Sequence, residues 1–250
     1  MRARPNQRAT EPHLVWDRPE PINRPAPSPL SRERIVRAAI ALADKDGLAS
    51  VSLRKVGAAL DAGPMRLYGY VSSKEELLEL MVDAVYGEIA SAGPIDADWR
   101  DALRTIAHRT RQATRVHGWF IDLLGGRPHL GPNALAHLEA SFAALSDAPG
   151  FEDIDVVLRA LGTVNAYVIG AIRSEASELR AERESGMNET EWQNATGSYM
   201  HRMIATGRFP TLAKVVRDAT HPPADVVFDQ GLECVLDGIA AQLRRRAGSG

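Results

Sequence analysis

A short segment in the first third of the chain carries side chains whose types and spacing suit contacts with DNA. Arg66 lies early in a predicted helix, and the arginine fork matches the O6 and N7 acceptors of guanine in the major groove. Its neighbours Pro64 and Met65 suit contact with a thymine methyl group. The hydroxyl of Tyr68 and the ammonium of Lys74 instead suit phosphate oxygens. This chemistry predicts a helix that reads bases while flanking side chains hold the DNA backbone.

Two short helices joined by a tight turn are predicted to position these side chains. Ser52 is a favourable N-cap, because its hydroxyl can accept a hydrogen bond from an amide two or three residues later. Apolar residues then recur at helical spacing, at Leu53, Val56 and Leu60. Turn residues occupy 61–63, and Pro64 suits the first position of a new helix. The pattern is that of a helix-turn-helix, whose second helix enters the major groove of DNA.

The region from Ser31 to about Tyr86 resembles the DNA-binding domain of TetR-type bacterial repressors. The residues that carry the resemblance are Asp46-Gly47, Ser52-x-Arg54-Lys55-Val56 and Leu67-Tyr68-x-Tyr70-Val71-Ser72-Ser73-Lys74-Glu75-Glu76-Leu77-Leu78. It implies that Tyr68 and Lys74 bind phosphates and that Arg54 points toward the same groove, to a base or a phosphate. Two positions depart from the commoner family forms. Asp61 replaces the Gly that is usual in the turn, and Tyr70 replaces a frequent His. The predicted DNA-binding residues are therefore Arg54, Pro64, Met65, Arg66, Tyr68, Tyr70 and Lys74.

Simpler interpretations of these side chains remain open. Arg66 also fits a phosphate contact or a solvent-facing arginine, and Pro64 fits a role as a helix starter alone. The ring of Tyr68 also fits half-buried packing. Tyr70 suits a base contact, a phosphate contact or mere cover for the domain, and the sequence favours none of these.

Composition limits the class of protein. The 250 residues suffice for one small and one larger domain, and 44% of them are hydrophobic. No apolar run approaches about 18 residues and the N-terminus lacks an apolar signal core, so we expect neither a membrane span nor a secretory signal. The single Cys234 excludes an intramolecular disulfide and fits a cytoplasmic location. The net charge is −2, yet residues 31–74 hold eight Lys or Arg against four Asp or Glu, which indicates a localised contact with a polyanion.

The chain divides by composition into four parts. They are predicted as a disordered Pro/Arg-rich extension (1–30), a helix-turn-helix DNA-binding domain (31–76), a helical ligand-binding and dimerisation domain (77–246) and a flexible tail (247–250). The extension contains seven of the fifteen prolines and five arginines, and an arm that enters the minor groove is the alternative to disorder. The first helix is expected over 31–45. A fourth helix, capped at Ser72 or Ser73, is expected to continue to Gly93 as a rod of roughly 30 Å.

The body also has helical patterns, so the predicted fold class is all-α. Caps are expected at Asp98 and at Asn188-x-x-Glu191, with an apolar helix over 154–172, a charged loop over 178–186 and a last helix over 224–245. The body resembles the C-terminal ligand-binding and dimerisation domain of the tetracycline-repressor branch. The residues that carry this resemblance are Trp99-x-x-x-Leu103, Arg127-Pro128-x-x-Gly131-Pro132-Asn133-Ala134-Leu135 and Ala160-Leu161-Gly162.

Small residues recur every four positions along the predicted 154–172 helix. This spacing allows another helix to approach closely. The resemblance places this helix and the last one in a four-helix dimer interface, and packing within the chain is the alternative. Cys234, in the last helix, is expected to be a small buried or interface residue. The predicted interface residues are Gly162, Ala166, Gly170, Leu232, Val235 and Ile239.

Aromatic residues of the body are candidates to line an effector pocket, although most aromatic residues at helical spacing are simply core. The predicted pocket residues are Trp119, Phe120, Asn165 and Tyr167. The histidines lack the i, i+4 spacing of a metal site, so neither a metal nor a cofactor is expected. Tetracycline-responsive relatives hold a magnesium–drug chelate with an Asn, a Phe and a His. The resemblance sets Ile106, Thr110 and Leu123 in those places, which argues against that inducer.

The sequence therefore predicts a homodimeric, ligand-responsive transcriptional regulator. It would repress by binding palindromic double-stranded operator DNA. A small-molecule effector would release it by binding with unequal affinity to two arrangements of the DNA-binding domains. An enzyme with a helical body is one alternative, but no Ser/His/Asp order, nucleophile elbow, phosphate loop or metal cluster supports it, so no enzymatic activity is expected. A DNA-binding protein without an inducer is the other alternative, and it predicts a filled body.

Overall fold

The protein is all-α in the residues that the computed structural model describes, which confirms the predicted fold class. The described residues are 14–21, 30–95 and 98–247. The chain forms two compact units. The first spans residues 1–93 and 127–138, and the second spans residues 94–126 and 139–250.

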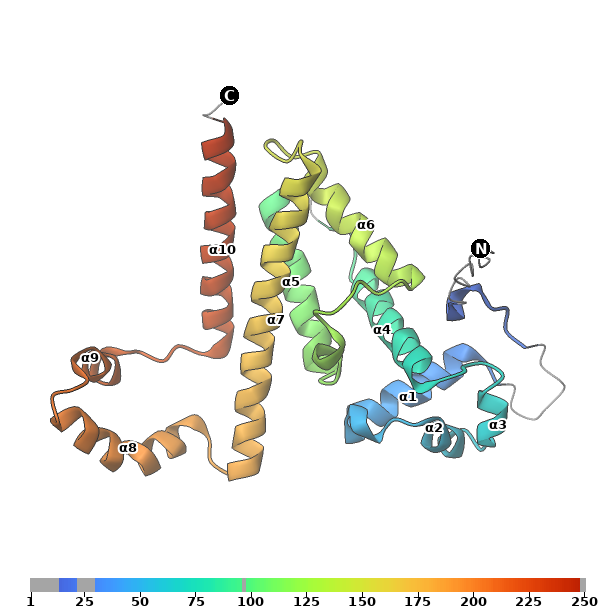
Figure 1. Cartoon of the computed structure of the whole chain (residues 1–250), viewed down its shortest axis with the longest axis horizontal. Coiled ribbons are helices and arrows are strands. Elements are labelled where there is room, and N and C mark those ends of the chain that lie inside the picture. Colours follow the sequence, from blue (N-terminus) through green and yellow to red (C-terminus); the bar gives the residue numbers. More distant parts are fainter. Residues whose placement is uncertain (1–13, 22–29, 96–97, 248–250) are drawn as a thin grey trace, which may run out of the picture. The chain divides into compact units, whose positions relative to one another are not determined.

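The first unit begins with a helical domain (Figure 1). Its helices are α1 (Arg32–Asp46), α2 (Leu53–Ala59), α3 (Pro64–Leu67) and α4 (Lys74–Ser91), with 3₁₀ turns at Val15–Asp17 and Leu48–Ser50. α1 begins where Ser31 accepts a hydrogen bond from the amide of Arg34, and it ends at Gly47, whose φ of 79° suits glycine. Its core is formed by fully buried residues from three helices, Ile35, Leu67 and Met81.

The turn between α2 and α3 is tightly packed. A Cβ atom at Gly57 would lie 2.7 Å from the carbonyl oxygen of Ala62, so a glycine lets α2 approach the turn closely. Asp61 has a φ of 50°, in the left-handed region that glycine favours and that Asp tolerates better than most residues. The helix-turn-helix therefore forms with Asp at a position where glycine is more usual.

Part of the N-terminal extension lies against the first unit. Val15 is 4% exposed, and Arg18 donates hydrogen bonds to the hydroxyl of Ser72 and, at 2.5 Å, to Glu76 Oε2. The prediction that residues 1–30 are disordered is therefore wrong for 14–21, because an apolar anchor and an ion pair hold this segment in place. The rest of the extension lies outside the described residues.

The predicted domain boundary between residues 76 and 77 falls inside α4. α4 packs against α1, so the whole of α4 belongs to the first unit. α6 (Pro132–Ser146) begins in the first unit and ends in the second. The boundary is displaced because the packing of α4, and not the change in composition, decides where the unit ends.

The second unit is built around α7 (Ile154–Ser185), which packs against both α5 (Trp99–Val116) and α10 (Ala224–Ala247). Its other elements are the 3₁₀ helix η3 (Phe120–Leu123), α8 (Glu189–Ala205) and α9 (Pro210–Asp218). The predicted caps are confirmed, because Asp98 accepts hydrogen bonds at the start of α5 and Asn188 forms a capping box with Glu191. The largest fully buried side chains of this unit are Leu103, Phe120, Leu145, Phe151, Leu232 and Leu236.

α7 continues well beyond the predicted apolar segment. It has 32 residues and ends at Gly186, whose φ of 68° is left-handed. The predicted charged loop over 178–186 is wrong, because this stretch consists mainly of good helix formers and meets no Gly or Pro before Gly186. By length and composition α7 would also pass as a membrane-spanning helix, unlike any other described helix, although we expected no such segment. α7 packs against α5 and α10 and buries Val157, Leu161, Val164 and Val168, whereas Ile154 and Leu158 are exposed.

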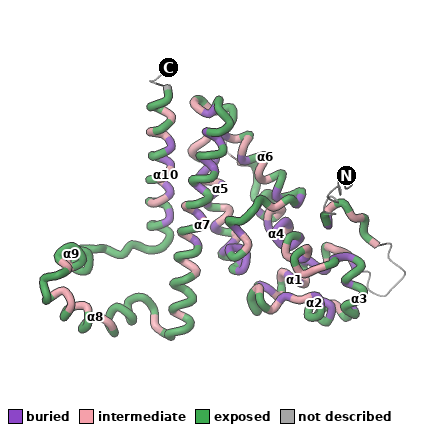
Figure 2. Tube along the Cα trace, in the orientation of Figure 1, coloured by how far each residue is buried: buried purple, intermediate pink, exposed green. Residues whose placement is uncertain are grey.

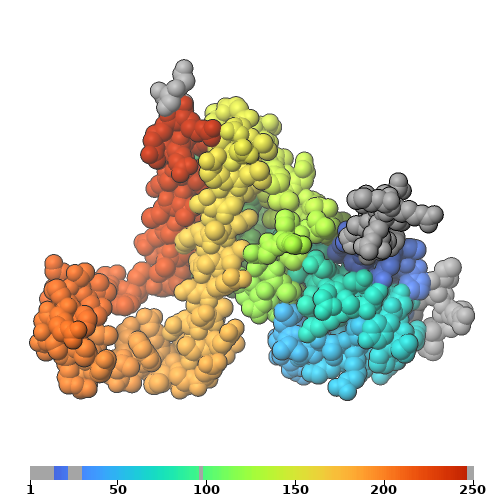
Figure 3. Space-filling view, in the orientation of Figure 1, coloured from blue at the N-terminus to red at the C-terminus, as the bar shows by residue number. Residues whose placement is uncertain are grey.

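α8 and α9 form an arm that buries none of its residues. The two helices pack on each other, and Figure 2 shows them mostly exposed, with intermediate stretches on α8 (pink). In Figure 3 the arm (orange) extends away from the packed parts of α7 and α10. It displays large apolar side chains to solvent, which are Trp192, Tyr199, Leu212, Val215 and Val216.

Two arginines of α5 form ion pairs with acidic residues of α10. Arg100 lies 2.5 Å from Glu233 and 2.6 Å from Asp237, and Arg104 lies 2.5 Å from Glu233. Hydrogen bonds from Arg104 and then Arg100 lower the pKa of Glu233 to about 2. The Glu233 side chain is 40% exposed, so solvent screens these pairs and their contribution to stability is on the order of 1 kcal/mol or less.

We expect Glu233→Gln to lower the free energy of unfolding at neutral pH by at most about 1 kcal/mol, with the difference from wild type vanishing in acid. The folded-state pKa of Glu233 lies below its usual 4.5, so its stabilising effect is complete above that value and is lost as the pH falls through about 2. Urea unfolding of both proteins across this pH range measures the difference. Glu184→Gln, at an exposed position of α7, is the control, and a difference that does not shrink in acid would contradict the assignment.

Candidate DNA-binding surface and effector-binding body

The helix-turn-helix exposes most of the side chains predicted to meet DNA. Met65 is 81% exposed and Tyr68 is 49% exposed, and Arg54, Pro64 and Arg66 are exposed as well. Arg54 lies in the first turn of α2, and the others lie on or directly after the four-residue α3. Each of these side chains is therefore available to DNA, and each remains a predicted contact.

Lys74 is the first residue of α4, which Ser73 caps by accepting a hydrogen bond from the amide of Glu76 at 3.2 Å. A helix N-terminus favours anions, and the ammonium of Lys74 adds a full positive charge there. The predicted phosphate contact therefore fits the position of Lys74. Glu75 and Glu76 place two carboxylates at the same end, and the pKa of Glu75 is lowered, mainly by its own backbone amide.

Tyr70 differs from the other predicted contacts because it is only 6% exposed. Its carbonyl oxygen accepts a hydrogen bond from Arg32 Nε at 3.2 Å, which ties this loop to the start of α1. The prediction that Tyr70 contacts DNA is therefore wrong, and the ring covers the domain, as one of the alternatives proposed. The chain turns here from α3 back into α4, so a side chain two residues beyond the exposed Tyr68 faces the interior.

A buried carboxylate joins α4 to the start of α6 within the first unit. Asp83 is 4% exposed and accepts hydrogen bonds from the amide of Ala134 at 2.9 Å and from Asn133 Nδ2 at 3.0 Å. A Cβ atom at Gly131 would overlap the Asp83 carboxyl group, so only glycine fits there. Sequence reasoning missed this contact. Its signals were a carboxylate among the apolar residues of the fourth helix and a helix start without its own Ser, Thr or Asp cap.

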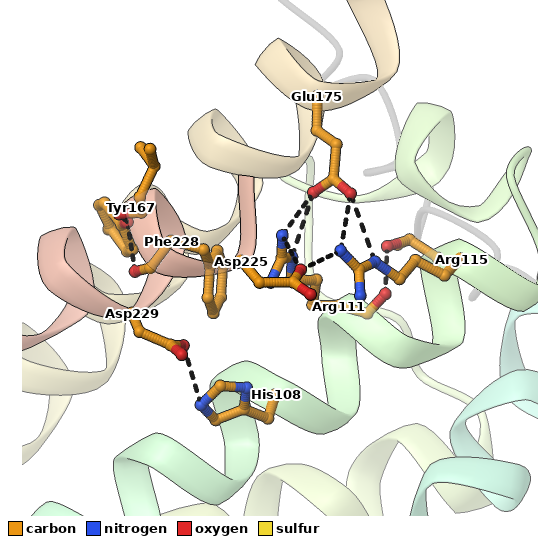
Figure 4. A network of polar contacts seen from close by, with 10 residues as sticks. His108, Arg111, Arg115, Tyr167, Glu175, Asp225, Phe228 and Asp229 are labelled. Atoms are coloured by element: carbon orange, nitrogen blue, oxygen red, sulfur yellow. Dashed lines mark hydrogen bonds and ion pairs between the residues drawn. The ribbon is translucent and has the colours of Figure 1, made fainter. Parts of the chain in front are cut away.

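A buried arginine of α5 binds acidic residues from two other helices of the second unit (Figure 4). Arg111 is 5% exposed, and its guanidinium lies 2.9 Å from Glu175 of α7 and 2.9 Å from Asp225 of α10. Arg115 binds the same two carboxylates and lowers the pKa of Asp225. Two positive and two negative side chains therefore compensate one another where α5, α7 and α10 meet.

Aromatic side chains extend this cluster along α10 (Figure 4). Arg111 Cζ lies 4.3 Å from the ring centroid of Phe228, a cation–π distance. The hydroxyl of Tyr167 donates a hydrogen bond to the carbonyl oxygen of Phe228 at 2.7 Å, and burial raises the pKa of Tyr167. A Cβ atom at Gly231 would overlap the Tyr167 ring, so α7 and α10 are close here. No sequence pattern indicated this cluster, because its members come from helices far apart in the chain.

The predicted pocket residues do not gather in one place. Trp119 and Phe120 are 4% and 0% exposed and pack beside His117 at η3, whereas Tyr167 faces α10. Asn165 is exposed on α7 and remains a predicted ligand contact. A polar residue in an apolar helix marked the solvent-exposed side of that helix. Trp119, Phe120 and Tyr167 remain predicted ligand contacts, with core packing as the alternative.

One face of α7 exposes its small residues. Gly162, Ala166 and Gly170 are exposed, and a Cβ atom at Gly162 or Gly170 would have no neighbour within 4 Å. Among the described residues this face therefore has no packing partner within the chain, which disfavours the alternative of intrachain packing. A groove of about 510 Å³ lies between α7 and α10, lined among others by Ala160, Thr163, Val235 and the exposed Cys234.

Leu232 and Ile239 belong to the core of the second unit. They are 1% and 8% exposed and have little surface left for a partner chain, so the prediction that they form the dimer interface is wrong. The apolar spacing along α10 marks the stripe that packs inside the chain. Val235 is half-buried at the groove and remains a predicted interface residue.

Known proteins are similar to this chain in sequence and in fold. Residues 93–243 match the model of the tetracyclin repressor-like C-terminal domain. The HTH-type transcriptional repressor DrrR1 of Streptomyces coeruleorubidus is 34% identical over 236 residues, which cover 94% of this chain and 86% of that protein. The chain belongs to the TetR family.

Solved structures of the TetR family have the same fold. Apo ActR from Streptomyces coelicolor matches this chain with a TM-score of 0.71 at 25% identity, covering 88% of this chain and 100% of that one. ActR in complex with actinorhodin matches with a TM-score of 0.72 at 24% identity, covering 86% and 97%. This TetR-family chain is thus a helix-turn-helix transcriptional regulator, and its relative DrrR1 is named a transcriptional repressor.

Arg66→Ala should relax the base preference of this TetR-family protein, at a cost of about 1–3 kcal/mol on the cognate site. The reason is that Arg66 is exposed on α3, where its guanidinium can bond to a guanine edge. Fluorescence anisotropy with cognate and scrambled duplexes measures the effect, and Arg37→Ala, a 72% exposed arginine of α1, is the control. Equal losses on both duplexes would reassign Arg66 to a phosphate.

Lys74→Ala should weaken binding to all DNA sequences by a similar factor. Removing one phosphate contact reduces the slope of log K against log salt by about one unit. Titrations at several salt concentrations measure this slope for the wild type and the variant. If the slope does not change, Lys74 makes no phosphate contact.

Proposed function

We propose that this protein is a homodimeric transcriptional repressor that binds a palindromic operator and leaves it when a small molecule binds the second unit. The observation that carries the proposal is the exposed surface of α3, with Met65 81% exposed beside Arg66, in a TetR-family chain. A large apolar side chain this exposed buries little within its own chain and suits a thymine methyl group. DrrR1, which is named a transcriptional repressor, supports the same direction of control. The DNA partner implies a cytoplasmic location.

The small-residue face of α7 supports the homodimer. Gly162 and Gly170 leave open space above this helix, and a twofold axis would pair the face with its own copy in an isologous interface. The exposed apolar residues of the α8–α9 arm offer further surface to a second chain. A dimer is what allows two α3 helices to meet half-sites about 34–36 Å apart on one side of the DNA.

The effector site is proposed at the junction of α5, α7 and α10 in the second unit. The guanidinium of Arg111 and the rings of Phe228 and Tyr167 provide charged and aromatic groups close together. ActR, which has this fold, has been solved with actinorhodin bound. An effector releases DNA only if it binds one arrangement of these helices better than the other.

α6 provides a route for the signal, because it begins in the first unit and ends in the second. Its start is fixed to α4 by the hydrogen bonds of Asp83 with Asn133 and Ala134. A shift of α6 must therefore move α4 or break these bonds. Because α4 carries Lys74 in its first turn, its movement alters the DNA-binding surface.

Anisotropy titrations with palindromic duplexes from the DNA upstream of this gene test the proposal. We expect salt-dependent binding, two chains per duplex by native mass spectrometry, and release by at least one member of a small-molecule library. Binding that no ligand reverses would favour a protein without an inducer. Failure to bind any palindrome would overturn the proposal, and turnover of an added compound would favour an enzyme.

Gly170→Leu should leave the chain folded and disrupt the dimer. The position has open space within the chain, so the new side chain collides only with a partner, and twofold symmetry introduces it on both sides. Overpacking typically costs about 1–3 kcal/mol per site. Sedimentation at micromolar concentration and operator titration are the measurements, with Gly118→Leu, also in open space, as the control. A folded variant that stays dimeric with wild-type operator affinity would show that this face is not the interface.

A further inference from the structure

A short N-terminal strap, Leu14–Pro21, packs on the unit that carries the helix-turn-helix. Val15 anchors it by burial, since this side chain is 4% exposed. Glu20 Oε1 accepts a hydrogen bond from the backbone amide of Arg32 at 3.1 Å, at the start of α1. The strap is thus fixed to the domain at two separate points, by the buried Val15 side chain and by the hydrogen bond of Glu20 at the start of α1.

Arg18 connects the same strap to the start of α4. Its guanidinium donates to the hydroxyl of Ser72 and lies 2.5 Å from Glu76 Oε2, and Glu76 Oε2 also accepts from the amide of Ser72 at 2.7 Å. The Arg18 and Glu76 side chains are 34% and 23% exposed, so the pair is partly shielded from solvent. Among the described residues the buried Nε atom of Arg18 has no hydrogen-bond partner, so the contact carries a folding cost.

The position of this pair matters because of its neighbours. Glu76 lies two residues after Lys74, at the helix end where a DNA phosphate is expected. An unpaired carboxylate at this place repels the phosphate that Lys74 attracts. Arg18 supplies the compensating charge from outside the helix-turn-helix.

We propose that the strap is part of the DNA-binding surface and that Arg18 is a positioning residue, which neutralises Glu76 beside the Lys74 phosphate contact. The inference rests on the proposed DNA-binding function. Arg18 acts through Glu76 and Ser72 and does not itself touch the DNA. Because the strap is held before DNA arrives, its ordering cost is not paid on binding.

Removing first one charge of the pair and then both tests this role. Arg18→Ala leaves Glu76 uncompensated, and we expect it to bind duplex DNA about tenfold more weakly at low salt. The double variant Arg18→Ala/Glu76→Gln removes both charges and keeps an oxygen for the Ser72 amide. It should return to within about twofold of wild-type affinity, with the wild-type salt slope.

Folding and charge controls make the result specific. Thermal melts must show that each variant is folded, and Arg37→Ala, which breaks a matched Arg–Glu pair on α1, should bind as the wild type. Wild-type affinity of Arg18→Ala, or a double variant as weak as Arg18→Ala, would overturn the proposal. A double variant whose salt slope falls by about one unit would also overturn it, since Arg18 would then touch a phosphate itself. Failure of the wild type to bind any DNA would overturn the proposed function as well.

Discussion

A carboxylate in a protein interior must be compensated, and Asp83 imposes this requirement on the first unit. The start of α6 compensates it, through the amide of Ala134 and the side chain of Asn133. The same contact requires glycine at position 131, because the Asp83 carboxyl group occupies the space that a Cβ atom there would need. α4 and the first turn of α6 are therefore one packed element, although more than half of α6 belongs to the second unit. The capped start of α4, with its phosphate-binding candidates, depends on where this element is held.

The second unit is stabilised by the same kind of compensation. Arg111 is buried against Phe228 and is neutralised by Glu175 and Asp225, so α5, α7 and α10 are linked at one point. Asp225 has a 64% exposed side chain and is the partner most open to solvent. A ligand that changes this charge balance changes the relative stability of two helix arrangements, which is what a regulatory effector requires.

Local contacts explain why the helix-turn-helix could be predicted, whereas the packing partner of each apolar face could not. The caps at Ser31, Ser52, Ser73 and Asp98 join residues two or three positions apart, so the sequence contains both partners. The apolar spacing along α10 is also a local pattern, but it does not predict which helix the apolar residues pack against. Leu232 and Ile239 are buried within their own chain, whereas no described residue packs over Gly162 or Gly170.

The sequence by itself determined the all-α class, the helix-turn-helix and the family, because these depend on residues close together in the chain. Only the tertiary structure decided that Tyr70 is interior, that Asn165 is on the surface and that Asp83 caps a distant helix. It also decided that the strap reaches Glu76, because this contact joins residues 58 positions apart. Burial and ion pairing depend on which distant segments pack together, and no local spacing encodes that choice.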